Sequence, residues 1–229
     1  MTRISIVVPV LNEAGVVAAG LAALAEFRAR GCELIVVDGA STDGTAEIAR
    51  PFADRVLISD PGRARQMNAG AGSASGDILI FLHVDTRLPE LAHERVRAGI
   101  ETSGCVWGRF DANIEGAHPL LGLIATMMNW RSRLTGIATG DQAMFVTRAA
   151  FRATGGFPAQ PLMEDIALSK ALKRLSPPLC LAERVTTSGR RWERHGIART
   201  ILFMWWLRLR YFFGASPALL ARTYYGKDV

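Results

Sequence analysis

Cysteine is scarce in this chain, with 3 among 229 residues. Cys32, Cys105 and Cys180 stand far apart, form no Cys-x-x-Cys pair and have no pair of histidines nearby. Zinc sites and disulfide frameworks both need cysteines at characteristic spacings. The sequence therefore indicates neither, and we expect the protein to work in a reducing compartment.

Long apolar stretches are also missing. No run reaches the roughly 18 uncharged apolar residues that cross a bilayer. The apolar run Ile4–Pro9 begins almost at the N-terminus, without the apolar core and small-residue cleavage site of a signal peptide before it. We therefore expect a cytoplasmic protein.

Two widespread nucleotide-binding motifs are absent. The chain has no G-x-x-x-x-G-K-[ST] phosphate-binding loop. Gly70-Ala-Gly72 begins like a dinucleotide fingerprint, but serine replaces the third glycine and the segment follows an expected helix instead of a strand. These absences argue against P-loop hydrolysis and against hydride transfer.

The composition is that of a folded globular chain. Hydrophobic residues make up 49% and charged residues 21%, which argues against disorder. The net charge of +6 favours anionic partners such as phosphates, nucleotides or an acidic membrane surface. Because the basic residues are spread along the chain and not clustered, we expect no nucleic-acid binding.

The first half alternates buried strands with helices. We expect strands at Ile4–Val8, Glu33–Val37, Arg55–Ser59 and Asp77–Leu82, and helices at Ala14–Arg30 and Arg63–Gly72. Alternation of this kind predicts an α/β fold with a doubly wound, mostly parallel sheet.

The second half is less regular. Strands are expected at Cys105–Ile114, Phe145–Thr147 and Leu179–Val185, and helices at Leu91–Ile100, Leu120–Arg133, Ala149–Thr154, Glu164–Leu175 and Ile197–Phe213. Met127, Met128 and Trp130 are interpreted as core or as lining of an acceptor pocket.

Polar residues follow three of the expected strands. Asn12 and Glu13 follow the first, Asp38–Asp43 the second and His83-Val-Asp85 the fourth. The carboxyl ends of parallel strands meet at one edge of a sheet, where ligands bind. These acids either hold a ribose, a base edge and a divalent metal, or, in the second group, only cap a turn and a helix.

The motifs of the chain resemble those of family 2 glycosyltransferases. The similar segments, in family order, are Val7–Glu13, Ile35–Thr45, Gly62–Gly70, Ile78–Thr86, Gly155–Phe157 and Met163–Asp165. The resemblance implies a glycosyltransferase A fold that binds a nucleotide sugar. Within the family, the chain is most similar to the short bacterial branch associated with radical-SAM and selenium-type gene neighbourhoods and named for arsenosugar biosynthesis.

The resemblance also implies where the nucleoside binds. By motif, Pro9, Leu11 and Glu13 line the nucleoside pocket, and Asp38 accepts hydrogen bonds from the base or the ribose.

Further residues are candidates for the diphosphate and the sugar. Arg63 and Arg65, which precede Asn68, either face the diphosphate as bidentate donors or are solvated at the surface. Asp141, between Gly140 and Gln142, is expected on the floor of the sugar or acceptor site.

The family's metal motif is altered in this chain. Asp85 matches the last acid of the D-x-D motif, but His83 stands where the first acid is expected. One carboxylate, diphosphate oxygens and water still suffice to hold Mg²⁺ or Mn²⁺. His83 is either a ligand, which would favour Mn²⁺, or a packed or supporting residue.

Asp165 matches the family's catalytic base, and Glu164 is a supporting residue or a second candidate. Transfer with inversion needs one carboxylate to take the proton of the acceptor. The alternative is that both acids only complement the positive end of a helix.

The C-terminal region carries two further signals. Residues 188–195 are similar to the Q-x-x-R-W element of processive relatives, but serine replaces the glutamine, so we expect no polymerisation. Arg190, Trp192 and their neighbours Arg191 and His195 are candidates to close over donor phosphates. The aromatic helix after them, with Arg199, Arg208 and Arg210, either lies on a membrane surface or packs on the core or a second subunit, giving a homodimer.

We therefore predict a metal-dependent, inverting glycosyltransferase that moves a sugar from a nucleoside diphosphate sugar to a small, apolar or lipid-like acceptor. The alternatives are a nucleotidyltransferase and a nucleotide-sugar or membrane-surface binding module without catalysis. We expect one domain over residues 1–229, with a nucleotide-binding half (1–90), an acceptor and catalytic half (91–190) and a C-terminal helical extension (191–229).

Overall fold

The computed structural model describes residues 2–190, 192 and 196–226. Within them the strands form one sheet with the order β3-β2-β1-β4-β7-β6-β8-β5. The strands are β1 (Ile4–Val10), β2 (Glu33–Asp38), β3 (Arg55–Ile58), β4 (Ile78–Phe81), β5 (Thr86–Arg87), β6 (Trp107–Glu115), β7 (Phe145–Thr147) and β8 (Leu179–Ser188).

The sheet is mostly parallel, as predicted. Strands β3, β2, β1 and β4 are all parallel, and so are β6 and β8. β7 runs antiparallel to both β4 and β6, and the short β5 runs antiparallel to β8. The antiparallel β7 therefore joins two parallel groups.

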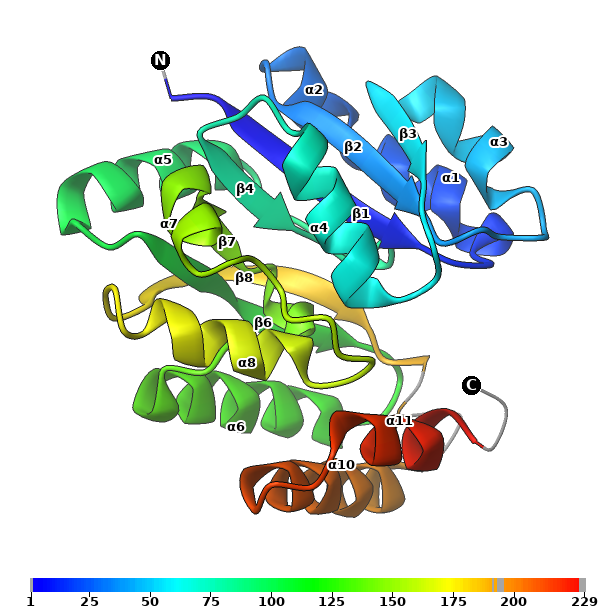
Figure 1. The fold of residues 1–229 in the computed structure, drawn as a ribbon, viewed down its shortest axis with the longest axis vertical. Coiled ribbons are helices and arrows are strands. Elements are labelled where there is room, and N and C mark those ends of the chain that lie inside the picture. The colour runs from blue at the N-terminus through cyan, green and yellow to red at the C-terminus, as the bar shows by residue number, and fades with distance from the viewer. Residues whose placement is uncertain (1, 191, 193–195, 227–229) are drawn as a thin grey trace.

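Helices cover both faces of the sheet (Figure 1). In the first half they are α1 (Ala14–Ala22), α2 (Ala25–Ala29), α3 (Thr45–Ala49) and α4 (Arg63–Ser73). In the second half they are α5 (Ala92–Ser103), α6 (Leu120–Thr135), α7 (Arg148–Ala153), α8 (Glu164–Leu172), α10 (Ile197–Phe212) and α11 (Pro217–Tyr225). The prediction of one continuous helix over residues 14–30 is wrong, because the chain turns between α1 and α2 and buries Leu24.

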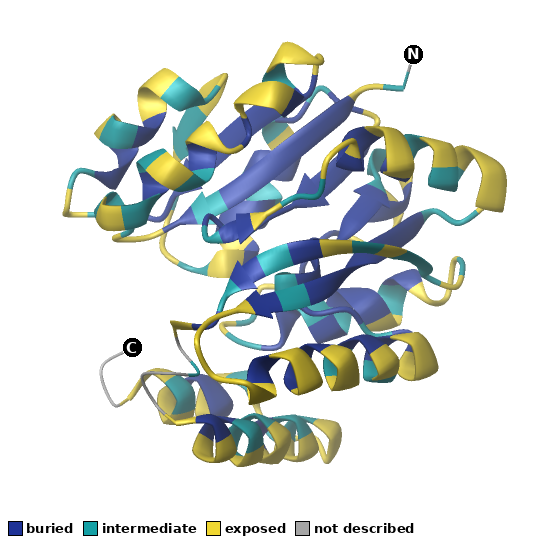
Figure 2. Cartoon of the chain, turned by 180° about the vertical axis from the view of Figure 1, so that it is seen from behind, coloured by how far each residue is buried: buried dark blue, intermediate teal, exposed yellow. Residues whose placement is uncertain are grey.

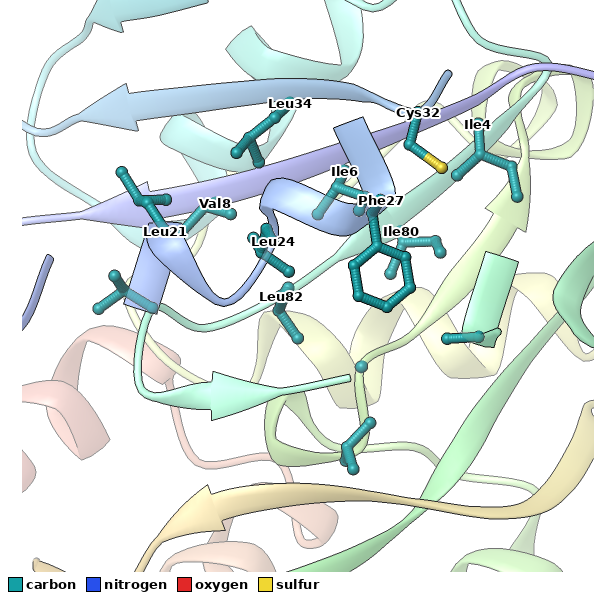
Figure 3. Packing of buried hydrophobic residues seen from close by; sticks show 14 of the residues in the cluster. Ile4, Ile6, Val8, Leu21, Leu24, Phe27, Cys32, Leu34, Ile80 and Leu82 are labelled. Atoms are coloured by element: carbon teal, nitrogen blue, oxygen red, sulfur yellow. The ribbon is translucent and has the colours of Figure 1, made fainter. Parts of the chain in front are cut away.

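Alternation along the strands divides the core into two layers. Ile6 and Val8 of β1 pack in one cluster with α1 and α2, whereas Val7 between them packs in another with α4, α7 and α8. Figure 3 shows Leu21 and Phe27 in the first cluster. Side chains of a strand point alternately to its two faces, so a β-branched run such as β1 supplies both layers.

The C-terminal helices pack on the start of α8. Leu207 of α10 and Leu220 of α11 are buried in one cluster with Met163 and Ile166. α11 lies within the predicted C-terminal helical extension but was not predicted as a separate helix. None of the helices in the described part of the chain has the length and apolar character needed to cross a membrane.

Buried polar contacts hold α6 on β6. The amide of Asn129 donates to the carbonyl oxygen of Ala112 at 2.9 Å and accepts from its N–H at 2.9 Å. Gln142 donates to the same amide oxygen of Asn129 at 3.3 Å. These contacts fix the segment that contains Asp141, which follows α6 in the chain.

Gly70 allows α4 to lie close to the sheet. A Cβ atom at Gly70 would lie 2.4 Å from Cγ1 of Val7, whereas nothing lies within 4 Å of one at Gly72 on the same helix. We expect Gly70→Ala to lower the free energy of unfolding by about 1–3 kcal/mol, as overpacking does. Gly72→Ala, the matched control, should raise it by up to about 1 kcal/mol through helix propensity. Equal effects in chemical denaturation would contradict this packing.

Candidate active site

A cavity of about 250 Å³ lies at the carboxyl ends of β1 and β4. Its walls come from the segments after these strands, from the loop around Asp141, from the start of α8, and from α10 and α11. The C-terminal helices therefore form one side of the cavity and the sheet edge forms another.

The cavity brings together eight of the twelve predicted site residues. They are Pro9, Glu13, Arg63, His83, Asp85, Asp141, Glu164 and Asp165. Leu11, Asp38, Arg65 and Asn68 do not line it.

Glu13 and Asp85 form an acidic pair at the sheet edge. Burial, and next the negative charge of Asp85, raises the pKa of Glu13 above its ordinary value. Arg190 Nη2 lies 3.7 Å from Asp85 Oδ2. Among the described residues no cluster of three or more His, Cys, Asp or Glu could hold a metal ion. A cation bound to Asp85 would therefore need oxygens from a ligand and from water, which Mg²⁺ commonly accepts.

His83 faces Asp141. Nδ1 of His83 lies 3.5 Å from Oδ1 of Asp141. Partial burial would raise the pKa of Asp141, but the hydrogen bond and charge of His83, with the charge of Arg63, hold it below its ordinary value. A Cβ atom at Gly140 would lie 2.5 Å from Nε2 of His83, so the imidazole ring packs against the backbone there.

Asp165 and Glu164 begin α8. The carboxylate of Asp165 accepts a hydrogen bond from the N–H of Gly140 at 3.0 Å and another from the N–H of Ile166 at 2.7 Å. Glu164 is buried, and its pKa is raised by burial and then by the charge of Asp165. Nε of Arg63 lies 4.0 Å from Oε1 of Glu164. Asp165 is thus the better solvated acid and is oriented by two backbone donors.

The structure gives other partners to the residues outside the cavity. Asp38 is 1% exposed, and its carboxylate accepts hydrogen bonds from the backbone and the hydroxyl of Ser41. The amide of Asn68 exchanges two hydrogen bonds with the backbone of Phe157, at 2.8 and 2.9 Å. Arg65 lies 3.9 Å from the exposed Asp60. Leu11 is 43% exposed and directly follows β1, at the carboxyl edge of the sheet.

The loops after β1 and β2 are joined by hydrogen bonds. Ser41 accepts from the N–H of Asn12 at 2.8 Å, and Asn12 accepts from the N–H of Thr42 at 2.9 Å. Asp43 accepts from the N–H of Ala14 at 3.0 Å. Ser41 therefore holds the turn after β1, and Asp43 holds the first residue of α1. This agrees with the alternative, drawn from the sequence, that these residues cap a turn and a helix.

Two arginines near the cavity were not predicted as site residues. Arg208 of α10 lines the cavity together with Thr200 and Met204. Their spacing of four residues along an aromatic helix is the signal that could have shown a common face. Arg131 of α6 lies near Arg208, and no motif marks it. Of the expected phosphate-closing residues, Trp192 lines the cavity, whereas Arg191 and His195 lie outside the described residues.

The known proteins to which the chain is similar include a curated glycosyltransferase and a mannosyltransferase of known structure. A PGL/p-HBAD biosynthesis glycosyltransferase of Mycobacterium tuberculosis is 41% identical over 93 residues, which cover 38% of this chain and 36% of the relative. The structure of S. aureus TarS 1–349 with UDP superposes with a TM-score of 0.64 at 18% identity, covering 81% of this chain and 60% of that one. The mannosyltransferase PcManGT of Pyrobaculum calidifontis, in complex with GDP-Man and Mn²⁺, gives 0.61 at 20% identity, covering 81% and 56%.

The chain spans little more than a third of the length of that curated relative. The solved structures share the glycosyltransferase A fold with this chain. Residues 5–151, well over half of the chain, match the family described as Glycosyl transferase family 2. The chain therefore belongs to glycosyl transferase family 2.

Proposed function

We propose that the protein transfers a sugar from a nucleoside diphosphate sugar, with inversion at the anomeric carbon and with the help of a divalent metal ion. The observation that carries this proposal is that Glu13, Asp85 and Asp165 surround one cavity at the carboxyl edge of the sheet. Residues 1–90 would bind the donor, 91–190 would supply the base and the acceptor site, and 191–229 would cover the acceptor side. Membership of the radical-SAM and arsenosugar branch stays a prediction from the sequence.

The donor site is proposed at the ends of β1 and β2. Pro9, Leu11 and Glu13 would line the nucleoside pocket, and Asp38 would offer its remaining lone pairs to the base or ribose. TarS was solved with UDP and PcManGT with GDP-Man, so both uridine and guanosine donors are candidates. Among the predicted diphosphate contacts, Arg63 lines the cavity, whereas Arg65 and Asn68 have other partners.

Asp85 is the proposed metal ligand. Burial, and next the repulsion from Asp85, raises the pKa of Glu13, and a cation beside the two acids would relieve that repulsion. Bound Mn²⁺ or Mg²⁺ would stabilise the negative charge of the departing diphosphate. His83 is proposed to orient Asp141 instead of completing the metal shell, because it already faces that carboxylate.

Asp165 is the proposed base, with Glu164 beside it. The acceptor oxygen forms a bond to the anomeric carbon while the bond from that carbon to the diphosphate oxygen breaks. The proton of the acceptor goes to the carboxylate of Asp165, and the electron pair of the broken bond leaves with the diphosphate. The N–H of Gly140 holds one carboxylate oxygen, which directs the other lone pairs of Asp165 for this transfer.

An apolar surface beside the cavity supports a lipid-like acceptor. The outer side of α6 exposes Leu120, Leu123, Met127, Trp130 and Leu134. The outer side of α10 exposes Leu202, Trp205, Trp206, Leu209 and Phe212, and the exposed Phe213 directly follows the helix. The prediction that Met127 and Trp130 belong to the core is wrong, since they are 49% and 65% exposed. Met128, from the same prediction, packs partly buried against the core cluster that contains Ile6 and Val8.

The two helices are neighbours, because Leu121 and Ile124 of α6 pack with Ile197 of α10 (Figure 2). Arg199 and Arg210 add positive charge to α10. Aromatic and basic residues on one helix face suit the headgroup layer of an anionic membrane. We propose that this surface, formed by α6 and α10, lies on the cytoplasmic face of the membrane.

Asp165→Asn tests the base. We expect nucleoside diphosphate release from a panel of nucleotide sugars to fall by a factor of a thousand or so, since general-base catalysis contributes about 10²–10⁴-fold. Nucleotide affinity should be almost unchanged. Asp60→Asn, at an acid that is 83% exposed, is the control. Turnover that survives within about tenfold, or roughly 1.4 kcal/mol of barrier, would show that Asp165 is not the base.

Asp85→Asn tests the metal ligand. UDP or GDP with Mn²⁺ should raise the melting temperature of the protein, because ligands that bind only the folded state stabilise it. In the variant the part of this rise that depends on Mn²⁺ should disappear. Asp77→Asn, outside the cavity, should keep it. A full Mn²⁺-dependent rise in the Asp85 variant would rule out the assignment.

Leu209→Glu tests the membrane surface. We expect the variant to sediment at least fivefold less with vesicles that contain phosphatidylglycerol, because an acid on this surface is repelled by anionic lipid. Ile58→Glu is the matched control, since Ile58 is 60% exposed on the edge strand β3 and Leu209 is 56% exposed. Equal vesicle binding by both variants, with loss of a dimer in light scattering for Leu209→Glu alone, would make the surface a subunit interface.

A further inference from the structure

Two arginines beside the cavity have buried nitrogen atoms that lack partners. Nε and Nη2 of Arg131 and Nε of Arg208 are shielded from solvent and make no hydrogen bond. Among the described residues, no carboxylate pairs with either guanidinium within 4.0 Å. In this respect they differ from Arg133, two residues after Arg131 on α6, which pairs with Asp111 at 2.6 Å.

The two guanidinium groups lie close enough to repel each other. Burial, and next the positive charge of Arg208, lowers the pKa of Arg131 to about 10. Because this pKa lies well above neutral pH, Arg131 keeps its charge there. A pair of like charges away from water is unfavourable unless an opposite charge compensates it. Among the described residues, Asp165 supplies part of that compensation, because its negative charge raises the pKa of Arg131.

The position of the pair relative to Asp165 distinguishes two sides of the cavity. Arg63, which also feels the charge of Asp165, comes from α4 and the donor side of the sheet. Arg131 and Arg208 come from α6 and α10, which lie away from the strands β1–β3 that carry the donor motifs (Figure 1). Arg208 lines the cavity itself. An anion bound by the pair would therefore lie next to the base, on the side opposite the donor.

We propose that the acceptor carries an anionic group, a phosphate or a carboxylate, which Arg131 and Arg208 bind beside Asp165. Guanidinium groups suit this role because their planar donors bind both kinds of oxyanion in bidentate fashion. The proposal rests on the proposed function, which it deepens: the acceptor combines an anionic head, held in the cavity, with an apolar remainder directed to the surface formed by α6 and α10. The two arginines would orient the acceptor hydroxyl toward the base.

The test titrates phenyl phosphate, benzoate and neutral benzyl alcohol into the full chain by calorimetry, with UDP or GDP and Mn²⁺ present at saturation so that the donor site is filled. We expect one or both anions to bind and benzyl alcohol not to bind. Arg131→Gln and Arg208→Gln should each weaken anion binding at least tenfold, and Arg208→Lys should weaken it less. Arg199→Gln, at an exposed arginine of the same helix, should leave it unchanged.

Nucleotide affinity separates this inference from the proposed function. If the Arg131 and Arg208 variants lose UDP or GDP affinity in step with anion affinity, the pair holds the donor diphosphate and the inference is wrong. Absence of anion binding to the unaltered protein also overturns it. If no nucleotide binds to the unaltered protein but the anions bind through these arginines, the proposed function fails while the anion site stands.

Melting temperatures distinguish anion binding by Arg131 and Arg208 from a purely structural role of these two arginines. Because the two charges repel each other, Arg131→Gln and Arg208→Gln should melt at the same or a higher temperature than the unaltered protein without anions. Phenyl phosphate or benzoate should raise the melting temperature of the unaltered protein and of Arg199→Gln, but not of these two variants. A marked fall for both variants without anions would mean that the arginines have partners within the chain and would contradict the proposal.

Discussion

The site depends on holding like charges close together at one edge of a parallel sheet. Glu13, Asp85, Glu164 and Asp165 meet around a single cavity, although burial and then the neighbouring acid, Asp85 or Asp165, raise the pKa values of Glu13 and Glu164. The surrounding structure tolerates this because backbone donors, Arg63 and Arg190 offset part of the repulsion. The remaining charge is suited to a cation on the donor side and to proton transfer at Asp165.

Sequence reasoning identified the sheet and its carboxyl edge because both depend on local patterns. The β-branched runs of β1 and β2 and the acids that follow them are visible in the sequence, and the parallel arrangement follows from their alternation with helices. The local contact of Ser41 with the carboxylate of Asp38 agrees with the capping alternative drawn from the sequence, but sequence reasoning could not foresee that the backbone of Phe157 occupies the amide of Asn68. The contact between Asn68 and Phe157 joins segments 89 residues apart, and nothing in the spacing of either residue encodes it.

The C-terminal helices complete a site that the sheet leaves open. Leu207 and Leu220 fix α10 and α11 on the start of α8, and this places Arg208 in the cavity wall while Trp205 and Leu209 face outward. One helix thus has an inner face that meets the reacting groups and an outer apolar face. The sequence showed the aromatic and basic character of this helix, but the partition between its faces depends on packing with α6 and α8.

The most direct test of the account is a crystal structure of the protein with Mn²⁺ and UDP or GDP. We expect the metal ion to be bound by Asp85 and the diphosphate, with the terminal phosphate inside the cavity that Asp165 lines. Nucleotide bound away from this cavity, or metal bound without Asp85, would contradict it.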